Sequence, residues 1–90
     1  MKNNIAKKTI ILYVLEVIKK GTRKTKPVSY ISIAKVLNSI GISCDRKTVS
    51  RNVDYLIEFG EPIVKVKGVG CYYDLTKKRE IATFFEEDEN

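Results

Sequence analysis

The period of the apolar residues changes near Gly60, from that of helices to that of strands, and no other feature of the sequence limits the fold as strongly. Before this point, apolar residues recur at i, i+3, i+4 and i+7 in three segments, as in amphipathic helices. After it, Pro62 to Lys67 alternates between apolar and polar residues, and Cys71 to Leu75 does so less regularly. The intervening Gly68-Val69-Gly70 is typical of a hairpin loop. The pattern therefore predicts three helices followed by a β-hairpin.

Capping residues indicate where the helices begin and end. Ser29 and Asp45 have short side chains whose oxygens can accept hydrogen bonds from the first turn of a helix. Gly21 and Gly60 stand where C-terminal caps belong. The helices are expected at residues 5–20, 30–39 and about 46–59, with a short fourth helix within residues 76–90.

The first helix carries two apolar stripes. Ile11, Val14, Leu15 and Ile18 are expected to face the core, and the second stripe lies roughly 120° around the helix. A helix with two apolar stripes needs two neighbours, so either the C-terminal segment or a second copy of the chain should cover the second stripe. The residues expected in a homodimer interface are Ile10, Tyr13 and Val17 of the second stripe and Ile81, Phe84 and Phe85 of the C-terminal segment.

Positive charge dominates most of the chain. The formal net charge is +6, from 17 Lys and Arg against 11 Asp and Glu. Residues 1–79 hold all 17 positive residues and six negative ones, a net charge of +11, whereas residues 80–90 hold the other five negative residues. A body with this charge attracts polyanions, of which nucleic acid is the commonest. The acidic stretch from Glu86 to Glu89 is either a solubilising tail or a mimic of DNA that shields the basic body.

The residue types that most catalytic and metal sites need are scarce. The chain has no His, the usual general base near neutral pH and the commonest metal ligand. Cys44 and Cys71 form no CxxC pair, so both are expected to be ordinary reduced side chains. We therefore expect a binding protein rather than an enzyme, with no metal or cofactor. No apolar run approaches the ~18 residues of a membrane helix and no signal-peptide pattern occurs, which favours a cytoplasmic protein.

Three helices and a hairpin in a small basic chain are the plan of a winged helix-turn-helix domain. We expect this domain in residues 1–75, and we expect residues 76–90 to form a short helix and an acidic tail. The major groove of DNA is about 12 Å wide and admits one helix, here the third. The hairpin would be the wing. Solvated surface remains an alternative for the wing and for the basic loop at residues 21–28. The expected DNA-binding residues are Arg46, Lys47, Thr48, Ser50, Arg51 and Tyr55 of the helix, Lys65 and Lys67 of the wing, and Arg23, Lys24 and Lys26 of the loop.

A longer motif supports the same assignment. Residues 45–51 read DRKTVSR, and Leu56, Glu58, Gly60 and Ile63 follow at fixed spacing before Tyr72-Tyr73. Over about residues 8 to 75, the chain resembles the N-terminal winged-helix domain of bacterial WYL-domain transcription regulators. In that family, a DRKTVxRDIxxLxExGxxI helix precedes a hairpin that ends in GYYL. The resemblance implies that the basic and small polar residues of the third helix face DNA. Asn52 replaces a residue that is usually acidic in the family, and the resemblance does not extend to the C-terminal effector domain.

We therefore expect a sequence-specific protein that binds double-stranded DNA, a small bacterial or phage transcription regulator. A homodimer on two half-sites would raise its affinity and specificity. The alternative is an anti-CRISPR-like inhibitor from a phage or mobile element, whose winged helix binds a host defence protein. Because a host defence protein can present an acidic surface, the basic face suits either partner, DNA or that protein.

Removing the acidic tail tests whether it shields the basic body. Deletion of residues 86–90 removes four negative charges and raises the formal net charge from +6 to +10. If the tail shields the body, the affinity for an arbitrary duplex should rise at low salt. It should converge with that of the full chain as salt screens the field. Equal affinities at low salt, measured by fluorescence anisotropy, would identify an inert tail.

Overall fold

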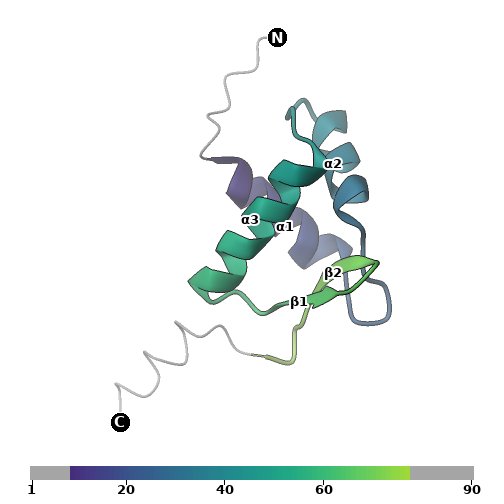
Figure 1. Ribbon diagram of the computed structural model, residues 1–90, viewed down its shortest axis with the longest axis vertical. Coiled ribbons are helices and arrows are strands. Elements are labelled where there is room, and N and C mark those ends of the chain that lie inside the picture. Colours follow the sequence, from purple (N-terminus) through teal and green to yellow (C-terminus); the bar gives the residue numbers. More distant parts are fainter. Residues whose placement is uncertain (1–8, 78–90) are drawn as a thin grey trace.

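The elements follow the order that the apolar pattern predicts. The computed structural model describes residues 9–77, in which three helices precede a two-stranded antiparallel sheet (Figure 1). This order confirms the α+β, winged-helix-like arrangement. Among the described residues, no helix has the length and apolar composition that crossing a membrane requires. The elements are α1 (Ile10–Gly21), α2 (Tyr30–Ser39), α3 (Arg46–Phe59), β1 (Ile63–Val66) and β2 (Gly70–Tyr73).

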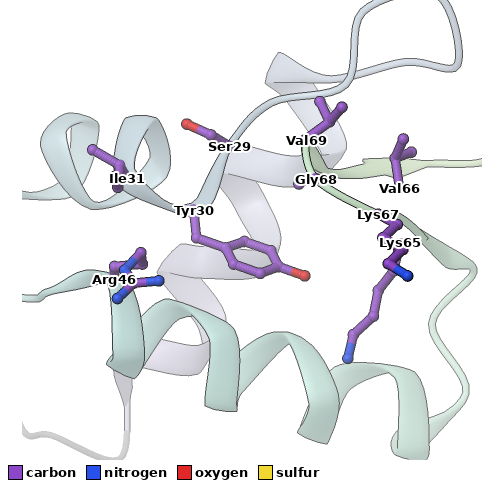
Figure 2. Close-up of a pocket in the computed structure, with 10 residues that line it drawn as sticks. Ser29, Tyr30, Ile31, Arg46, Lys65, Val66, Lys67, Gly68 and Val69 are labelled. Atoms are coloured by element: carbon purple, nitrogen blue, oxygen red, sulfur yellow. The ribbon is translucent and has the colours of Figure 1, made fainter.

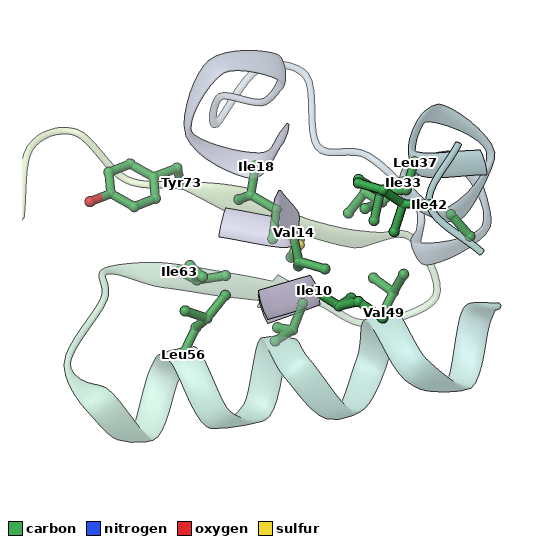
Figure 3. Close-up of a cluster of buried hydrophobic side chains, with 13 residues drawn as sticks. Ile10, Val14, Ile18, Ile33, Leu37, Ile42, Val49, Leu56, Ile63 and Tyr73 are labelled. Carbon is green, nitrogen blue, oxygen red and sulfur yellow. The ribbon is translucent and has the colours of Figure 1, made fainter. Parts of the chain in front are cut away.

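The helices and the hairpin enclose one core of apolar side chains (Figure 3). Complete burial of a side chain of this size contributes about 1.5–3 kcal/mol relative to exposure. Cys71 of β2 is buried within the core, and Tyr73 closes one end of it. The helical side chains with no exposed surface are Val14 and Ile18 of α1, Ile33 and Leu37 of α2, and Val49 and Val53 of α3.

α1 is rotated relative to the orientation that the sequence predicts. Its buried line consists of Ile10, Val14 and Ile18. Ile11 and Leu15, which were expected to face the core, are half-buried and pack against its edge. The cause is that α2, α3 and β2 all contact α1. A helix with three neighbours buries a line between its two apolar stripes and covers parts of both.

Thr22, rather than Gly21, fixes the end of α1. Gly21 is the last helical residue, and Thr22 follows in an extended conformation. The Thr22 hydroxyl donates to the carbonyl oxygen of Ile18 at 2.7 Å and accepts from the backbone N–H of Tyr73 at 2.8 Å. Because Thr22 is buried, its hydroxyl satisfies two backbone groups that water does not reach. The expected glycine cap is therefore replaced by a side-chain bridge from α1 to β2.

The segment between α1 and α2 adds an edge to the sheet, although the sequence predicts only a loop there. Arg23 and Lys26 close a turn through two backbone hydrogen bonds. Val28 then pairs with Cys71 of β2 through two more, at 2.9 and 3.0 Å. This pairing requires glycine at position 70, because a Cβ atom there would lie 1.9 Å from the carbonyl oxygen of Val28.

Local side-chain hydrogen bonds set the bounds of α2 and α3, as the sequence predicts. Ser29 and Asp45 are the N-caps, and each side chain accepts a hydrogen bond from a backbone N–H of the first turn. Gly60 ends α3 in the left-handed region, at φ 115°. Between the two helices, the amide of Asn38 donates to the carbonyl oxygen of Cys44 at 2.8 Å. That bond fixes the turn from which α3 begins.

The hairpin is shorter than the alternation of residues 62–67 and 71–75 predicts. Ile63 pairs with Tyr73, and Val66 pairs with Gly70. The loop therefore begins at Lys67, and the residues that follow Tyr73 leave the sheet. Residues 76 and 77 form a turn and a bend rather than a helix. The rest of the expected C-terminal helix, residues 78–90, lies outside the described part of the chain.

Substitution of Gly70 should be far more costly than substitution of Gly21. Gly70→Ala places a methyl group in the space that the Val28 carbonyl occupies, so the pairing with Cys71 must break. We expect a loss of about 2 kcal/mol or more in the free energy of unfolding, measured by urea denaturation. Gly21→Ala is the control, because a Cβ atom there meets nothing within 4 Å. Equal stability of the two variants would contradict this account of the sheet edge.

Candidate nucleic-acid interface

α3 begins at a well-defined capping site. The Asp45 carboxylate accepts a hydrogen bond from the backbone N–H of Thr48 at 2.8 Å. Hydrogen bonds from Thr48 hold the pKa of the Asp45 carboxyl below its usual range. Asn52, at the position that is usually acidic in the resembled family, donates to the carbonyl oxygen of Thr48 at 3.0 Å. Asn52 therefore adds no charge to α3, and its amide bonds within the helix.

α3 lies across the front of the molecule in Figure 1, with α1 behind it and the hairpin below. The half-buried residues Thr48 and Ser50 flank its outward face. Asp54 and Glu58 follow on that face toward the C-terminal end, so the positive charge is concentrated in the first two turns. Four of the expected DNA-binding residues are exposed on α3, namely Arg46, Lys47, Arg51 and Tyr55.

An open groove of about 480 Å³ separates the start of α3 from the wing and from the N-terminus of α2 (Figure 2). Arg46 and Lys65 lie on opposite sides of it, and the Tyr30 ring lies between them with its hydroxyl toward Lys65. Burial raises the pKa of the Tyr30 hydroxyl, which therefore stays protonated at neutral pH. Lys67, in the turn of the wing, also lines the groove. A groove with these three cations suits an anionic group.

Lys65 is not the unpaired wing cation that the sequence suggests. Its ammonium nitrogen lies 2.5 Å from a carboxylate oxygen of Asp54, so β1 and α3 are joined by an ion pair. The hydrogen bond to Asp54 raises the pKa of Lys65. Both side chains keep about half of their surface exposed, at 50% and 55%. The opposite charges were visible in the sequence, but their proximity depends on the docking of the hairpin against α3.

The basic loop lies apart from this groove. Arg23, Lys24 and Lys26 are exposed in the turn that precedes Val28. Because Val28 pairs with β2, this turn lies at the edge of the sheet opposite β1. None of the three residues lines the groove beside α3. The fold therefore brings the helix and wing residues together, but not the loop residues.

Of the residues expected in a dimer interface, the three on α1 do not form one exposed stripe. Ile10 belongs to the core, and Val17 packs against it. Tyr13 is 37% exposed. The C-terminal half of the set, Ile81, Phe84 and Phe85, lies outside the described residues.

Cys71 belongs to the core, and Cys44 packs against it. Neither forms a disulfide; Cys71 is buried and Cys44 is half-buried. Burial raises the pKa of the Cys71 thiol to about 11, so the thiol stays neutral at physiological pH. Within residues 9–77, no group of three His, Cys, Asp or Glu residues is placed to hold a metal ion.

No protein-family model matches the chain, and searches of curated proteins and of solved structures found no match. The resemblance to WYL-domain regulators therefore depends on the motif residues alone.

The cap of α3 should give the protein a pH-dependent component of stability. A carboxyl whose pKa is lowered on folding stabilises the folded state above its unfolded pKa, and this effect is lost as the pH falls through the lowered value. Asp45→Asn keeps an acceptor but loses the charge. The gap in Tm between the native chain and Asp45→Asn should therefore be widest near neutral pH. It should shrink as the pH falls below the usual aspartate pKa of 3.8.

The cap of α2 supplies the matched control for that experiment. Ser29 caps α2 through a hydroxyl that does not titrate in this range, accepting from Ser32 at 3.1 Å. Ser29→Ala should cost about 1 kcal/mol at every pH. Thermal unfolding followed by circular dichroism between pH 7 and about pH 3 measures both variants. A constant gap for Asp45→Asn would contradict the assigned role of its charge.

Proposed function

We propose that this protein binds double-stranded DNA in a sequence-specific way and acts as a small transcription regulator. α3 is the recognition helix and enters the major groove with its first turns. The observation that carries the proposal is the exposure of Lys47 and Arg51 on one face of a capped helix beside the hairpin. Long basic side chains in that position can reach guanine edges or phosphates.

The charges beside α3 support the same partner. Lys67 in the wing turn and Arg46 at the start of α3 flank the groove, so a DNA backbone that runs along α3 meets a cation on each side. Contacts of this kind fix the position of a duplex without reading its sequence. Arg51, farther along the helix, is the residue proposed to read a base edge.

A protein partner is the second candidate, and two exposed aromatic residues favour it. Tyr55 and Phe59 are 50% and 55% exposed and lie one helical turn apart on α3. Exposed aromatic side chains are enriched at protein interfaces. In this alternative, α3 binds a host defence protein, the basic residues pair with acidic groups of that protein, and duplex DNA binds weakly without sequence preference.

Selection from random duplexes, followed by anisotropy titrations, tests the proposal. Selection should return an enriched motif. Arg51→Ala should weaken binding to the selected duplex by about 1–3 kcal/mol, because a bidentate base contact is worth that much. Lys67→Ala should weaken binding to all duplexes alike. It should also reduce the slope of log K against log salt by about 0.9, the value of one phosphate contact.

Lys20→Ala is the matched control. Lys20 is an exposed cation of α1 that pairs with Glu16 at 3.1 Å, and it is not among the residues that line the groove beside α3. Its removal should leave affinity for the selected duplex within about twofold of the native value, since it lies outside the proposed contact. Selection that returns no motif, together with an Arg51→Ala variant that binds duplexes as the native protein does, would contradict the proposal. Loss of a co-purifying protein in that variant would then favour the alternative.

A further inference from the structure

Two acidic residues, Asp54 and Glu58, stand within the face of α3 that is proposed to contact DNA, and Asp54 is the one that pairs with Lys65. At about 100° per residue, Asp54 lies roughly 20° around the helix from Lys47 and roughly 60° from Arg51. Its carboxylate is the ion-pair partner of Lys65 on β1, and Lys65 lines the groove. A carboxylate in this position repels a DNA backbone. It also neutralises the ammonium group of Lys65, which would otherwise attract the backbone.

The pair does little for the stability of the fold. Both side chains are about half-exposed, and ion pairs with that exposure stabilise proteins only slightly. The hairpin is already held by its pairing with Val28 and by the core residues of β2. Exchange of the Asp54 carboxylate for another anion would therefore leave the fold intact. A DNA phosphate is such an anion, and it is the one that the proposed function brings to this groove.

We propose that Asp54 is a specificity-determining residue of the DNA interface. It keeps Lys65 in the ion pair unless the duplex offers both a phosphate oxygen to Lys65 and a hydrogen-bond donor to Asp54. This inference depends on the proposed function. On a cognate duplex, Lys65 exchanges the carboxylate for a phosphate oxygen. The released Asp54 then accepts a hydrogen bond from a base amino group in the major groove, of which the N4 amino group of cytosine is the usual donor to a carboxylate.

A duplex without that amino group leaves one of the two partners unsatisfied. If Lys65 moves to a phosphate, the Asp54 carboxylate is left beside the backbone without a donor. If Lys65 stays with Asp54, the wing makes one phosphate contact fewer. Either outcome weakens binding to arbitrary sequences, so the pair discriminates against the wrong duplex as well as favouring the right one.

The first experiment measures affinity for an arbitrary duplex over a range of salt concentrations. Asp54→Asn should raise that affinity about two- to fivefold at low salt, the scale of one exposed ion pair. It should also steepen the slope of log K against log salt by about 0.9, because Lys65 becomes free to contact a phosphate. Glu58→Gln is the matched control, since it removes one negative charge from the same face, one turn later. This control should raise affinity through net charge alone and leave the slope unchanged.

Three further experiments test whether the effect comes from the ion pair of Asp54 and Lys65. In a Lys65→Gln background, Asp54→Asn should no longer steepen the slope, whereas Glu58→Gln should act as before. Selection from random duplexes with Asp54→Asn should lose a cytosine preference at one position that the native protein shows. An NMR titration of the Lys65 side chain in the free protein should show that its raised pKa falls in Asp54→Asn.

The outcomes distinguish this inference from the proposed function. A native protein without salt-dependent duplex binding overturns both. A native protein that binds a selected motif, together with an unchanged slope in Asp54→Asn, overturns only the role of Asp54. A slope that steepens equally in Glu58→Gln also overturns that role, because the effect then comes from net charge.

Discussion

The arrangement of the molecule depends on how the hairpin is attached to the helices. A two-stranded hairpin alone is marginally stable in water. Here, Val28 pairs with Cys71 on the free edge of β2, and the buried Thr22 hydroxyl joins the end of α1 to Tyr73. Both attachments come from the segment between α1 and α2, and the first exists only because Gly70 leaves room for a carbonyl oxygen. They give the wing a fixed position beside α3. The groove, the ion pair of α3 with β1 and the grouping of basic residues all follow from that position.

The sequence predicts those parts of the fold that short-range chemistry controls. The bounds of α2 and α3 are correct because Ser29, Asp45 and Gly60 act within one turn of their helices. The rotation of α1 and the extra sheet edge were missed because both depend on contacts between distant segments. Thr22 and Tyr73, for example, are 51 residues apart in the chain. No periodicity marks such a contact, and a threonine after a helix has many other uses.

The same distinction between short-range and long-range contacts applies to the candidate site. The exposed basic residues of α3 could be identified from helical geometry, since residues opposite an apolar face must point outward. The pairing of Lys65 could not be identified from the sequence, because its partner, Asp54, lies on a different element, α3. Counting cations alone would therefore overstate the positive charge that the wing offers to an anion. With Lys65 paired, the other cations beside the start of α3 and the groove are Arg46, Lys47, Arg51 and Lys67.

We propose that α3 and the wing together form the surface that contacts DNA. Backbone amide NMR of the labelled protein, titrated with a duplex carrying the selected motif, tests it most directly. We expect the largest shifts on residues 46–51 of α3 and on the wing turn near Lys67, with little change along the outward face of α1 around Tyr13. Largest shifts on α1, or shifts spread evenly over all exposed cations, would contradict a specific interface at α3 and the wing.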